Sequence, residues 1–394
     1  MQAFIDGLIG DAGGVAREAL YLGGMLAFGA IVVFGFVLPV AGGTSWLERR
    51  VWARIQSRIG PNRVGPQGFL QWLADGIKNL LKEDIVPQAA DGPLFRVAPY
   101  VVVTGFIAAF VAVPFAGVLI IADLNIGILY ITAMTSLVVV GILVAGWSSN
   151  NRWSMLGGIR SATQIVSYEI PAGLAIFPAV LLSGTLSMQG IIAAQGWQPH
   201  QWHMFHSPFA LAAFLLFFIA ALAEGNRTPF DLPEAESELV AGFATEYSGM
   251  RSLLFFLAEW GNLYLIGALV VTLYMGGWQV APFTDDPLLL TAAQFGVFFL
   301  KSYFWVLVAM WVRGTLPRVR VDQLMSACWK YLVPLSLLCV LATALLMVTL
   351  PGGESEMMRW ATVALVAAVL VRFAMRVRFH LKRARSLEGA ATAR

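Results

Sequence analysis

Four ionisable side chains lie inside long apolar stretches of the sequence or at their ends. They are Glu169, Glu224, Glu259 and Lys301. An unpaired charge at bilayer depth costs at least about 2.5–3.5 kcal/mol. Such residues therefore persist where they pair, face a polar cavity or change protonation in function. A fixed salt bridge between helices, such as one between Lys301 and a glutamate, is the purely structural alternative.

A second concentration of acid groups follows Glu224. Only 12% of the chain is charged, yet the stretch PFDLPEAESELVAG, residues 229–242, contains four carboxylates. The acidic residues of this loop are Asp231, Glu234, Glu236, Glu238 and Glu246. They outnumber the nearby bases Arg227 and Arg251, and carboxylates crowded at low dielectric cannot all ionise. The pattern predicts the inner end of a file of acids that runs into the membrane and passes protons.

The composition indicates what surrounds these residues. The chain is 58% hydrophobic with a mean hydropathy of +0.74, whereas soluble domains are about 45–50% apolar. Apolar stretches long enough to cross a hydrocarbon core of about 30 Å recur along the whole sequence. We therefore expect an all-α, polytopic transmembrane helical bundle. The expected spans are 20–40, 98–121, 127–147, 165–186, 207–224, 252–275, 289–312, 329–350 and 357–377.

Lysine and arginine are unevenly distributed between the loops that connect these spans. The basic loops are 48–96, 148–163, 225–251 and 313–328. The alternate connections, which contain neither residue type, are 122–126, 187–206 and 276–288. Because basic residues favour the cytoplasmic side, the N-terminus is expected outside and the four basic loops inside. A ninth span would return the basic C-terminal tail to the inside.

The longest basic loop contains two helical patterns. Arg50, Arg54 and Arg58 form an i, i+4 stripe before the breaker Gly60-Pro61. Farther on, apolar residues at helical spacing predict a helix in the membrane interface. These residues are Phe69, Trp72, Leu73, Ile77, Leu80 and Leu81. Anchoring to anionic lipid is one explanation for the bases. The rigid GPNRVGP turn favours a second explanation, in which Arg58 and Arg63 lie at the mouth of an apolar slot.

Other kinds of site find little support in the sequence. It has no phosphate-loop, zinc-protease, nucleophile-elbow or dinucleotide motif. Cys328 and Cys339 lie about 16 Å apart along one helix, too far for a disulfide, and an iron–sulfur cluster usually needs four thiolates. The cluster of three histidines in loop 187–206 lacks a cysteine or acidic partner. We expect no metal, no iron–sulfur cluster and no nucleic-acid binding on this chain.

Four long motifs on the expected inner side identify a family. They are ERRVWARIQSRIGPNRVGPQGFLQWLADGIK, GWSSNNRWSMLGGIRSATQIVSYEIP, LAEGNRTPFDLPEAESELVAGFATEYSG and WVRGTLPRVRVDQLMSACWK. They closely resemble the signatures of the H subunit of NADH–quinone oxidoreductase, the membrane subunit at the heel of respiratory complex I. The match runs in order from about residue 20 to 350. Thr163, Trp260 and Val321 depart from the commoner residues of that family, which bears on fine quinone specificity.

The resemblance implies a fold and a set of site residues. Residues 1–350 would form eight transmembrane helices, several of them tilted, and residues 351–394 would add the ninth span and the tail. The substrate would be a quinone, either ubiquinone or menaquinone. The residues that would line its channel are Arg49, Arg58, Asp75, Arg227, Phe230, Asp231 and Phe256. The proton path would use Glu169, Glu224, Glu234, Glu236, Glu238, Glu246 and Glu259, with Lys301, Arg313 and Arg318.

The expected function follows from this resemblance. We expect a subunit of a proton-pumping NADH–quinone oxidoreductase that forms part of the quinone channel and couples quinone reduction to proton translocation. Its partners would be the peripheral-arm iron–sulfur and quinone-site subunits, the small and antiporter-like membrane subunits, and membrane lipid. The expected location is the bacterial inner membrane, with the mitochondrial inner membrane as the alternative.

Two other functions remain open at this point. One is the homologous membrane subunit of a hydrogenase- or formate-linked complex, because the electron donor depends on partner chains. The other is a self-contained cation/proton antiporter, with which buried acids and a mid-span lysine are compatible. Transporters of that kind commonly contain inverted repeats with paired broken helices, and we find no internal repeat in the sequence.

Overall fold

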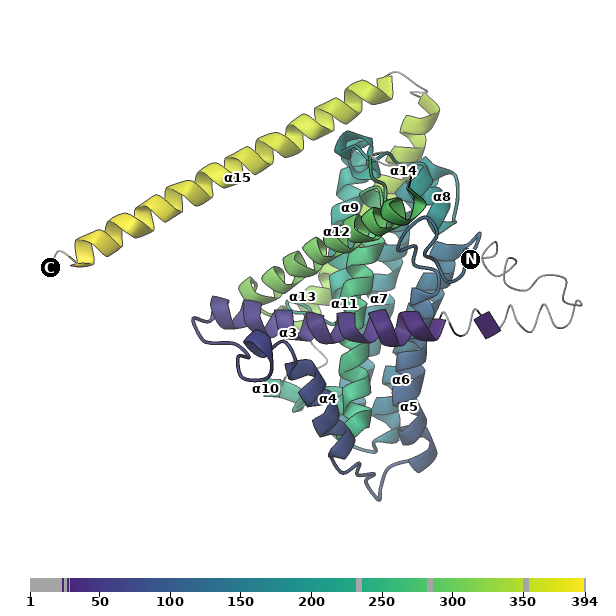
Figure 1. Cartoon of the computed structure of the whole chain (residues 1–394), viewed down its shortest axis with the longest axis vertical. Coiled ribbons are helices and arrows are strands. Elements are labelled where there is room, and N and C mark those ends of the chain that lie inside the picture. The colour runs from purple at the N-terminus through teal and green to yellow at the C-terminus, as the bar shows by residue number, and fades with distance from the viewer. Residues whose placement is uncertain are drawn as a thin grey trace, which may run out of the picture.

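The structure is a computed structural model that describes residues 23–24, 27, 29–231, 236–281, 286–349 and 354–392. Over these ranges all the regular elements are helical, which confirms the all-α prediction (Figure 1). Within the described ranges, eight helices are long and apolar enough to cross a membrane. They span Gly29–Ile55, Gly92–Phe110, Gly127–Ser148, Arg152–Ser183, Gly249–Tyr274, Pro287–Thr315, Val321–Thr349 and Glu356–Arg378. A further apolar helix, α9 (Pro208–Glu224), is shorter.

Each expected span overlaps one of these helices, although the ends differ: the span expected at 98–121, for example, overlaps a helix that ends at Phe110. In the numbering of Figure 1 they belong to α3 (Leu38–Ile55), α5 (Gly92–Phe110), α6 (Gly127–Ser148), α7 (Arg152–Ser183), α9, α11 (Gly249–Tyr274), α12 (Pro287–Thr315), α13 (Val321–Ala327), α14 (Val333–Thr349) and α15 (Glu354–Thr392). A π-helical segment, η1 (Val33–Val37), continues into α3, and another, η6 (Cys328–Leu332), joins α13 to α14.

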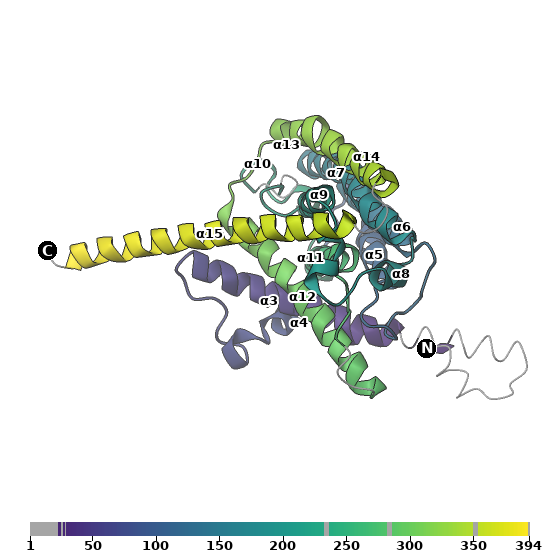
Figure 2. The same ribbon diagram turned by 90° about the horizontal axis from the view of Figure 1, so that it is seen from above.

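The centre of the molecule is a bundle of steep helices. Figure 1 shows α5, α6, α7, α9 and α11 running nearly along the long axis, with α3 lying across them and α12 oblique. The view from above shows that α3 and α12 both cover the same side of α11 (Figure 2), and both pack on it. Two tilted helices thus close one side of the bundle, as the family resemblance implied.

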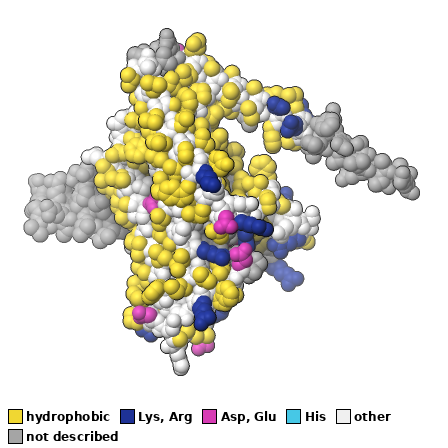
Figure 3. All heavy atoms as spheres, turned by 180° about the vertical axis from the view of Figure 1, so that it is seen from behind, with side chains coloured by type: hydrophobic (Ala, Val, Ile, Leu, Met, Phe, Trp, Pro, Cys, Tyr) yellow, Lys and Arg dark blue, Asp and Glu magenta, His cyan; other side chains and the backbone are white. Residues whose placement is uncertain are grey.

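Small residues let the steep helices approach closely. A Cβ added to Gly146 of α6 would lie 3.1 Å from the Cα of Gly158 on α7, so these two glycines bring the backbones into contact. Large side chains fill the remaining interior, and Phe95, Tyr168 and Tyr264 are fully buried. Figure 3 shows hydrophobic side chains over much of the outer face, while charged ones gather on one part of it. An apolar perimeter of this kind suits a lipid environment.

The first span extends farther than the sequence indicated. We expected it to end near residue 40, but α3 continues to Ile55. The charged run that lowers the local hydropathy lies on this helix, whose apolar residues Leu47 and Val51 pack on the core. Glu48 and Arg49 are therefore residues of a span and not of a loop.

The basic segment after α3 contains a turn and then the predicted second helix. Ser57 has a φ of 54°, so the helix and its arginine stripe end before Arg58. Helix α4 (Gln71–Leu81) has no fully buried residue, and its apolar side chains Ile77 and Leu81 are exposed. Trp72 is held against α3 because Gly42 there has no side chain: an added Cβ would lie 2.5 Å from the indole ring.

Helix α15 contacts the rest of the chain only near its beginning among the described residues. It packs on two short helices of loop 187–206, which precedes α9. They are η3 (Pro199–Gln201) and η4 (His203–Phe205). The rings of Trp360 and His200 stack there with centroids 5.1 Å apart. Beyond these contacts the helix projects away from the bundle (Figures 1 and 2). The expected boundary between residues 350 and 351 falls outside the described ranges.

Candidate functional site

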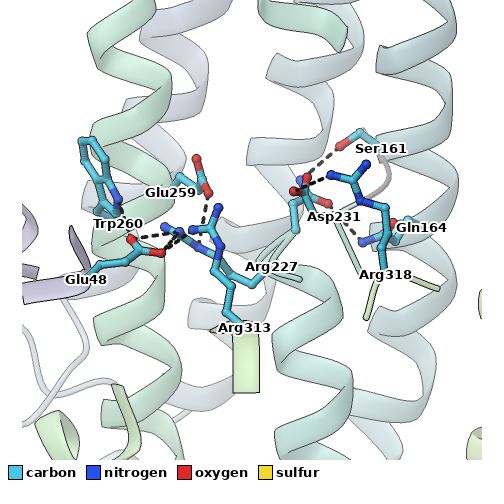
Figure 4. A network of polar contacts seen from close by, with 10 residues as sticks. Glu48, Ser161, Gln164, Arg227, Asp231, Glu259, Trp260, Arg313 and Arg318 are labelled. Atoms are coloured by element: carbon cyan, nitrogen blue, oxygen red, sulfur yellow. Dashed lines mark hydrogen bonds and ion pairs between the residues drawn. The ribbon is translucent and has the colours of Figure 1, made fainter. Parts of the chain in front are cut away.

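Four charged side chains from four separate segments meet inside the protein (Figure 4). Arg227 follows α9, and its Nη1 lies 3.1 Å from Oε1 of Glu48 on α3. Its Nε lies 3.2 Å from Oε1 of Glu259 on α11. Arg313 of α12 forms an ion pair with the same oxygen of Glu48. We call these four residues the buried ion cluster. Its two carboxylates and two guanidinium groups compensate one another, which burial requires.

The position of Arg227 is set by the turn that follows α9. The amide nitrogen of Gln164 on α7 donates to the carbonyl oxygen of Ala223 at 2.8 Å and to that of Phe230 at 2.7 Å. One buried side chain thus holds both ends of the turn. Asn226 at the apex has a φ of 50° and donates to Ser161. These contacts fix the turn against α7 and direct Arg227 into the interior, where it is 2% exposed.

A second ion pair lies at the end of the same turn. Nη2 of Arg318 is 3.4 Å from Oδ2 of Asp231, whose side chain is buried (Figure 4). The backbone N–H of Val319 donates to the carbonyl oxygen of Pro229 at 3.0 Å. The segment after α12 is therefore tied to the turn through both backbone and side chains.

A cavity of about 570 Å³ opens between α3, α4 and α11. Most of its wall is apolar, with side chains such as Leu73, Leu253 and Leu257. Its charged wall residues include Arg49 and Asp75, whose Nη1 and Oδ2 atoms are 2.6 Å apart. An apolar chamber with a few placed polar groups is the usual form of a site for a largely apolar ligand.

The cavity adjoins the buried ion cluster through Trp260. Trp260 lines the cavity beside Phe256, and the two rings stack with centroids 5.8 Å apart. On the other side, its indole N–H donates to Oε2 of Glu48 at 3.0 Å. One residue of α11 thus belongs both to the wall of the chamber and to the surroundings of the cluster.

Two smaller cavities continue from the cluster into the bundle. The first, of about 60 Å³, is lined by Glu259, Glu224 and Asn262. The second, of about 160 Å³, is lined by Glu224, Asn262 and Glu169. Because both have Glu224 and Asn262 in their walls, they adjoin. Each is larger than the roughly 10–15 Å³ that one water needs, so each has room for water beside the glutamates in its wall.

The acids of this line differ in their partners. Glu259 is held by Arg227, whereas Glu169 accepts a hydrogen bond from the hydroxyl of Ser136. Within the described ranges, no arginine or lysine forms a salt bridge with Glu169 or Glu224. The two inner acids are therefore outside the fixed ion pairs that the purely structural alternative requires.

The expected quinone-lining residues divide into groups. Arg49, Asp75 and Phe256 line the large cavity. Arg227 lies in the buried ion cluster and Asp231 in the second ion pair. The ring of Phe230 packs on Tyr168, 5.7 Å between centroids. Arg58 is exposed after α3 and is not among the residues that line the cavity.

The loop acids are spread over different surroundings. Glu238 is exposed and pairs with Arg160 at 2.9 Å. Glu246 accepts a hydrogen bond from the side chain of Asn151 at 2.6 Å. Glu236 begins α10 (Glu236–Leu239), but its side chain lies outside the described part of the chain, as does the whole of Glu234.

Lys301 is separated from the glutamates. Its Nζ donates to the carbonyl oxygens of Met275 at 2.9 Å and Gly277 at 3.2 Å, just after α11 ends. It also lies 4.7 Å from the ring centroid of Trp202. Glu259 is in the first half of α11, about 24 Å from Met275 along a straight helix. The contacts of Lys301 are those of a cation that binds the C-terminal carbonyls of a helix.

The histidine cluster of loop 187–206 is built into the fold. Nδ1 of His203 lies 3.1 Å from the carbonyl oxygen of Leu273, and its side chain is 4% exposed. Burial lowers the pKa of His203 to about 4, and the nearby charges of His206 and Arg359 act in the same direction. At neutral pH this ring is therefore uncharged.

Several residues of the site were not recognised as such in the sequence. They are Glu48, Thr135, Gln164 and Asn262, and Trp260 was noted only as a departure from a family pattern. Glu48 could have been found by extending the first span through the amphipathic run that follows residue 40. The polar uncharged residues have no such signal, because their role depends on which helices face each other.

Comparisons with known proteins agree with one another. A family model described as NADH dehydrogenase matches residues 28–344. The H subunit of the NADH-quinone oxidoreductase of Anaeromyxobacter dehalogenans is 54% identical over 373 residues, 91% of this chain and 90% of that protein. The protein of the same name from Chlorobium luteolum is 45% identical, with coverages of 83% and 90%. The NADH-quinone oxidoreductase subunit 8 of Rhodothermus marinus is 43% identical, with coverages of 83% and 97%.

Proposed function

Since the chain belongs to the family of the H subunit of NADH-quinone oxidoreductase, we propose that it forms part of the quinone channel and couples quinone reduction to proton translocation. One observation carries this proposal. The large apolar cavity shares Trp260 with the surroundings of the buried ion cluster, and two smaller cavities, mostly apolar but with glutamates in their walls, continue from the cluster to Glu224 and Glu169. A ligand chamber and a line of acids therefore meet at one point.

The composition of the chamber suits a quinone. Its apolar wall matches an isoprenoid tail, and Arg49 and Asp75 offer a cation and an anion near its polar part. Ubiquinone and menaquinone both have this combination of an apolar tail and a ring with two carbonyl groups. In this proposal the turn after α9 supports the chamber through the contacts of Arg227, Phe230 and Asp231. Arg58 acts outside the chamber, on the basic surface.

The line of acids suits the proton part of the proposal. Reduction of a quinone to a quinol takes up two electrons and two protons, so negative charge appears in the cavity until the protons arrive. That charge favours protonation of nearby carboxylates and disturbs the balance of the buried ion cluster. Water in the two smaller cavities can then carry protons between Glu259, Glu224 and Glu169. The loop acids Glu234, Glu236, Glu238 and Glu246 are proposed as the inner end of this line.

The remaining parts of the proposal concern surroundings. The chain is a multi-pass membrane protein. We place it in the bacterial inner membrane with its N-terminus outside, because the basic loops then face the cytoplasm. The peripheral-arm and antiporter-like subunits are its proposed partners. Residues 1–350, which include the matched range 28–344, form the proposed family unit, to which residues 351–394 are an addition.

Narrowing the cavity tests the quinone part. Gly76 lines the cavity, and a Cβ added there meets no atom within 4 Å. The first carbon of the side chain in Gly76→Leu therefore lies in open space, and the rest of the side chain adds apolar bulk to the cavity wall. We expect the KM for quinone to rise severalfold in the assembled complex. Gly296→Leu on α12 is the matched control, because its added Cβ is equally unobstructed and it lies outside this cavity. Equal KM values in both variants would overturn the proposal.

Neutralising one acid tests the proton part. Glu224→Gln keeps the shape of the side chain and removes its ability to ionise. We expect quinone reduction to continue at a reduced rate and the number of protons translocated per quinone to fall. Glu83→Gln, at an exposed position on the loop after α4, is the control. A full proton yield in Glu224→Gln would count against the proposal, as would cation/proton exchange by the purified chain alone.

A further inference from the structure

Trp260 occupies the boundary between the chamber and the buried ion cluster. Its ring belongs to the cavity wall, stacks on Phe256 with an interplanar angle of 28° and lies 6.0 Å from the guanidinium carbon of Arg49. A planar ring, such as that of a quinone, that enters this cavity meets an aromatic wall on which it can stack.

The opposite edge of the same ring donates to the cluster. The indole N–H lies 3.0 Å from Oε2 of Glu48, and Nη1 of Arg227 lies 3.3 Å from that oxygen. The other oxygen of Glu48 accepts from Arg227 and Arg313. Indole has one N–H to donate, and Glu48 is almost fully buried, so the carboxylate has little contact with solvent that could replace this hydrogen bond when the ring moves.

Hydrogen-bond strength falls steeply with length and misalignment. A ligand that shifts the indole ring by a fraction of an ångström therefore changes how firmly Glu48 is held. Glu48 would then be held by its ion pairs with Arg227 and Arg313. Arg227 is also the partner of Glu259. The contents of the cavity can thus reach Glu259, the first acid of the line, through one side chain.

We propose that Trp260 is a positioning residue that transmits occupancy of the quinone cavity to the buried ion cluster through its hydrogen bond to Glu48. The inference rests on the proposed function. It adds to that function a specific contact by which the chamber and the line of acids communicate.

Two substitutions separate the two roles of Trp260, as part of the cavity wall and as hydrogen-bond donor to Glu48. Trp260→Phe keeps an aromatic wall and removes the N–H. Trp260→His loses the six-membered ring but keeps a nitrogen at the ring position of the indole N–H. At pH 8 the imidazole is largely neutral, so it can donate without adding charge. Both variants are measured in the complete membrane complex. The quinone reduction rates are normalised to the amount of complex, which is determined from NADH oxidation with a water-soluble acceptor.

We expect the two variants to split kcat from KM. Trp260→Phe loses a hydrogen bond to a charged group, which predicts a fall in kcat of about tenfold or more with little change in KM for quinone. Trp260→His should retain more of kcat and raise KM, because part of the wall is gone. Phe256→Leu, which alters the wall away from Glu48, should raise KM alone.

The outcomes are distinguishable. If Phe256→Leu raises KM while Trp260→Phe keeps the wild-type kcat, the chamber function stands and the role of Trp260 is overturned. If Trp260→Phe and Trp260→His lower kcat equally, the residue acts by packing alone and the inference is again overturned. If none of the three variants changes quinone kinetics, the proposed function fails with it.

Discussion

Removing Arg227 should expose how strongly the buried ion cluster is coupled. The perturbation is a double-mutant cycle of Arg227→Met and Glu259→Gln, each with little change in volume. Arg227→Met leaves Glu48 and Glu259 with Arg313 as the remaining cation of the cluster. Breaking a buried pair in this way costs about 3–5 kcal/mol. Glu259→Gln leaves one excess positive charge, and the double variant restores neutrality.

The magnitude of the coupling follows from the geometry. Nε of Arg227 and Oε1 of Glu259 are 3.2 Å apart. At an effective dielectric constant of about 20, that distance corresponds to an attraction of about 5 kcal/mol before solvation is considered. Desolvation offsets part of it, so we expect a coupling energy of about 2–4 kcal/mol. The double variant should therefore be more stable than Arg227→Met alone.

The assay is thermal unfolding of the detergent-solubilised complex. Unfolding is monitored as the loss of this chain from the assembly. The matched control is the cycle Arg160→Met and Glu238→Gln. That pair has a similar separation of 2.9 Å, but its side chains are 33% and 58% exposed, and such pairs contribute about 0–1 kcal/mol. Melting temperatures that fall additively in the Arg227 cycle, as in the surface cycle, would refute the reasoning.

Three further predictions follow from other contacts. Lys301→Met should lower stability by about 1.5–3 kcal/mol, since a charged hydrogen-bond donor is lost, yet leave the protons translocated per quinone unchanged; a lower proton yield would assign Lys301 to the proton path instead. His203 has its pKa lowered from 6.5 to about 4 by burial, so the unfolded chain binds its proton first, and stability should fall by about 3 kcal/mol as the pH drops from 6.5 toward 4. His203→Gln should flatten that part of a plot of melting temperature against pH. Gly261→Ala should destabilise the protein by about 1–3 kcal/mol, because the added Cβ would lie 1.9 Å from Cζ of Phe106. Combining it with Phe106→Leu should restore stability, whereas the control Gly296→Ala, whose added Cβ meets no atom, should have no such cost.

The positions of the helices could be predicted from the sequence because burial in lipid imposes a local requirement. Each span needs a long apolar run, and all nine expected spans overlap apolar helices. The same local reasoning misplaced the end of the first helix. Glu48 and Arg49 lower the hydropathy of their segment, yet α3 continues because its apolar side chains pack on the core and its charged ones find partners.

The partners of the charged residues could not be predicted in the same way. The sequence indicated that buried acids must pair or face polar space, and both outcomes occur, for Glu259 and Glu224 respectively. Which outcome applies to which residue depends on contacts between segments such as Glu48 and Arg227, 179 residues apart. A salt bridge between Lys301 and a glutamate was the purely structural alternative, but the ammonium group donates instead to the carbonyl oxygens of Met275 and Gly277, just after α11 ends.

The limited contact of α15 with the rest of the protein has a consequence for biosynthesis. Helix α15 follows the other described helices in the sequence, and it touches the rest of the protein through its first turns, on η3 and η4. The side chains that line the three cavities all precede it in the chain. Synthesis and packing can therefore proceed in the same order, with the residues of the chamber and of the two smaller cavities already made before α15 emerges from the ribosome. A messenger that stopped ahead of Glu354 would still encode them.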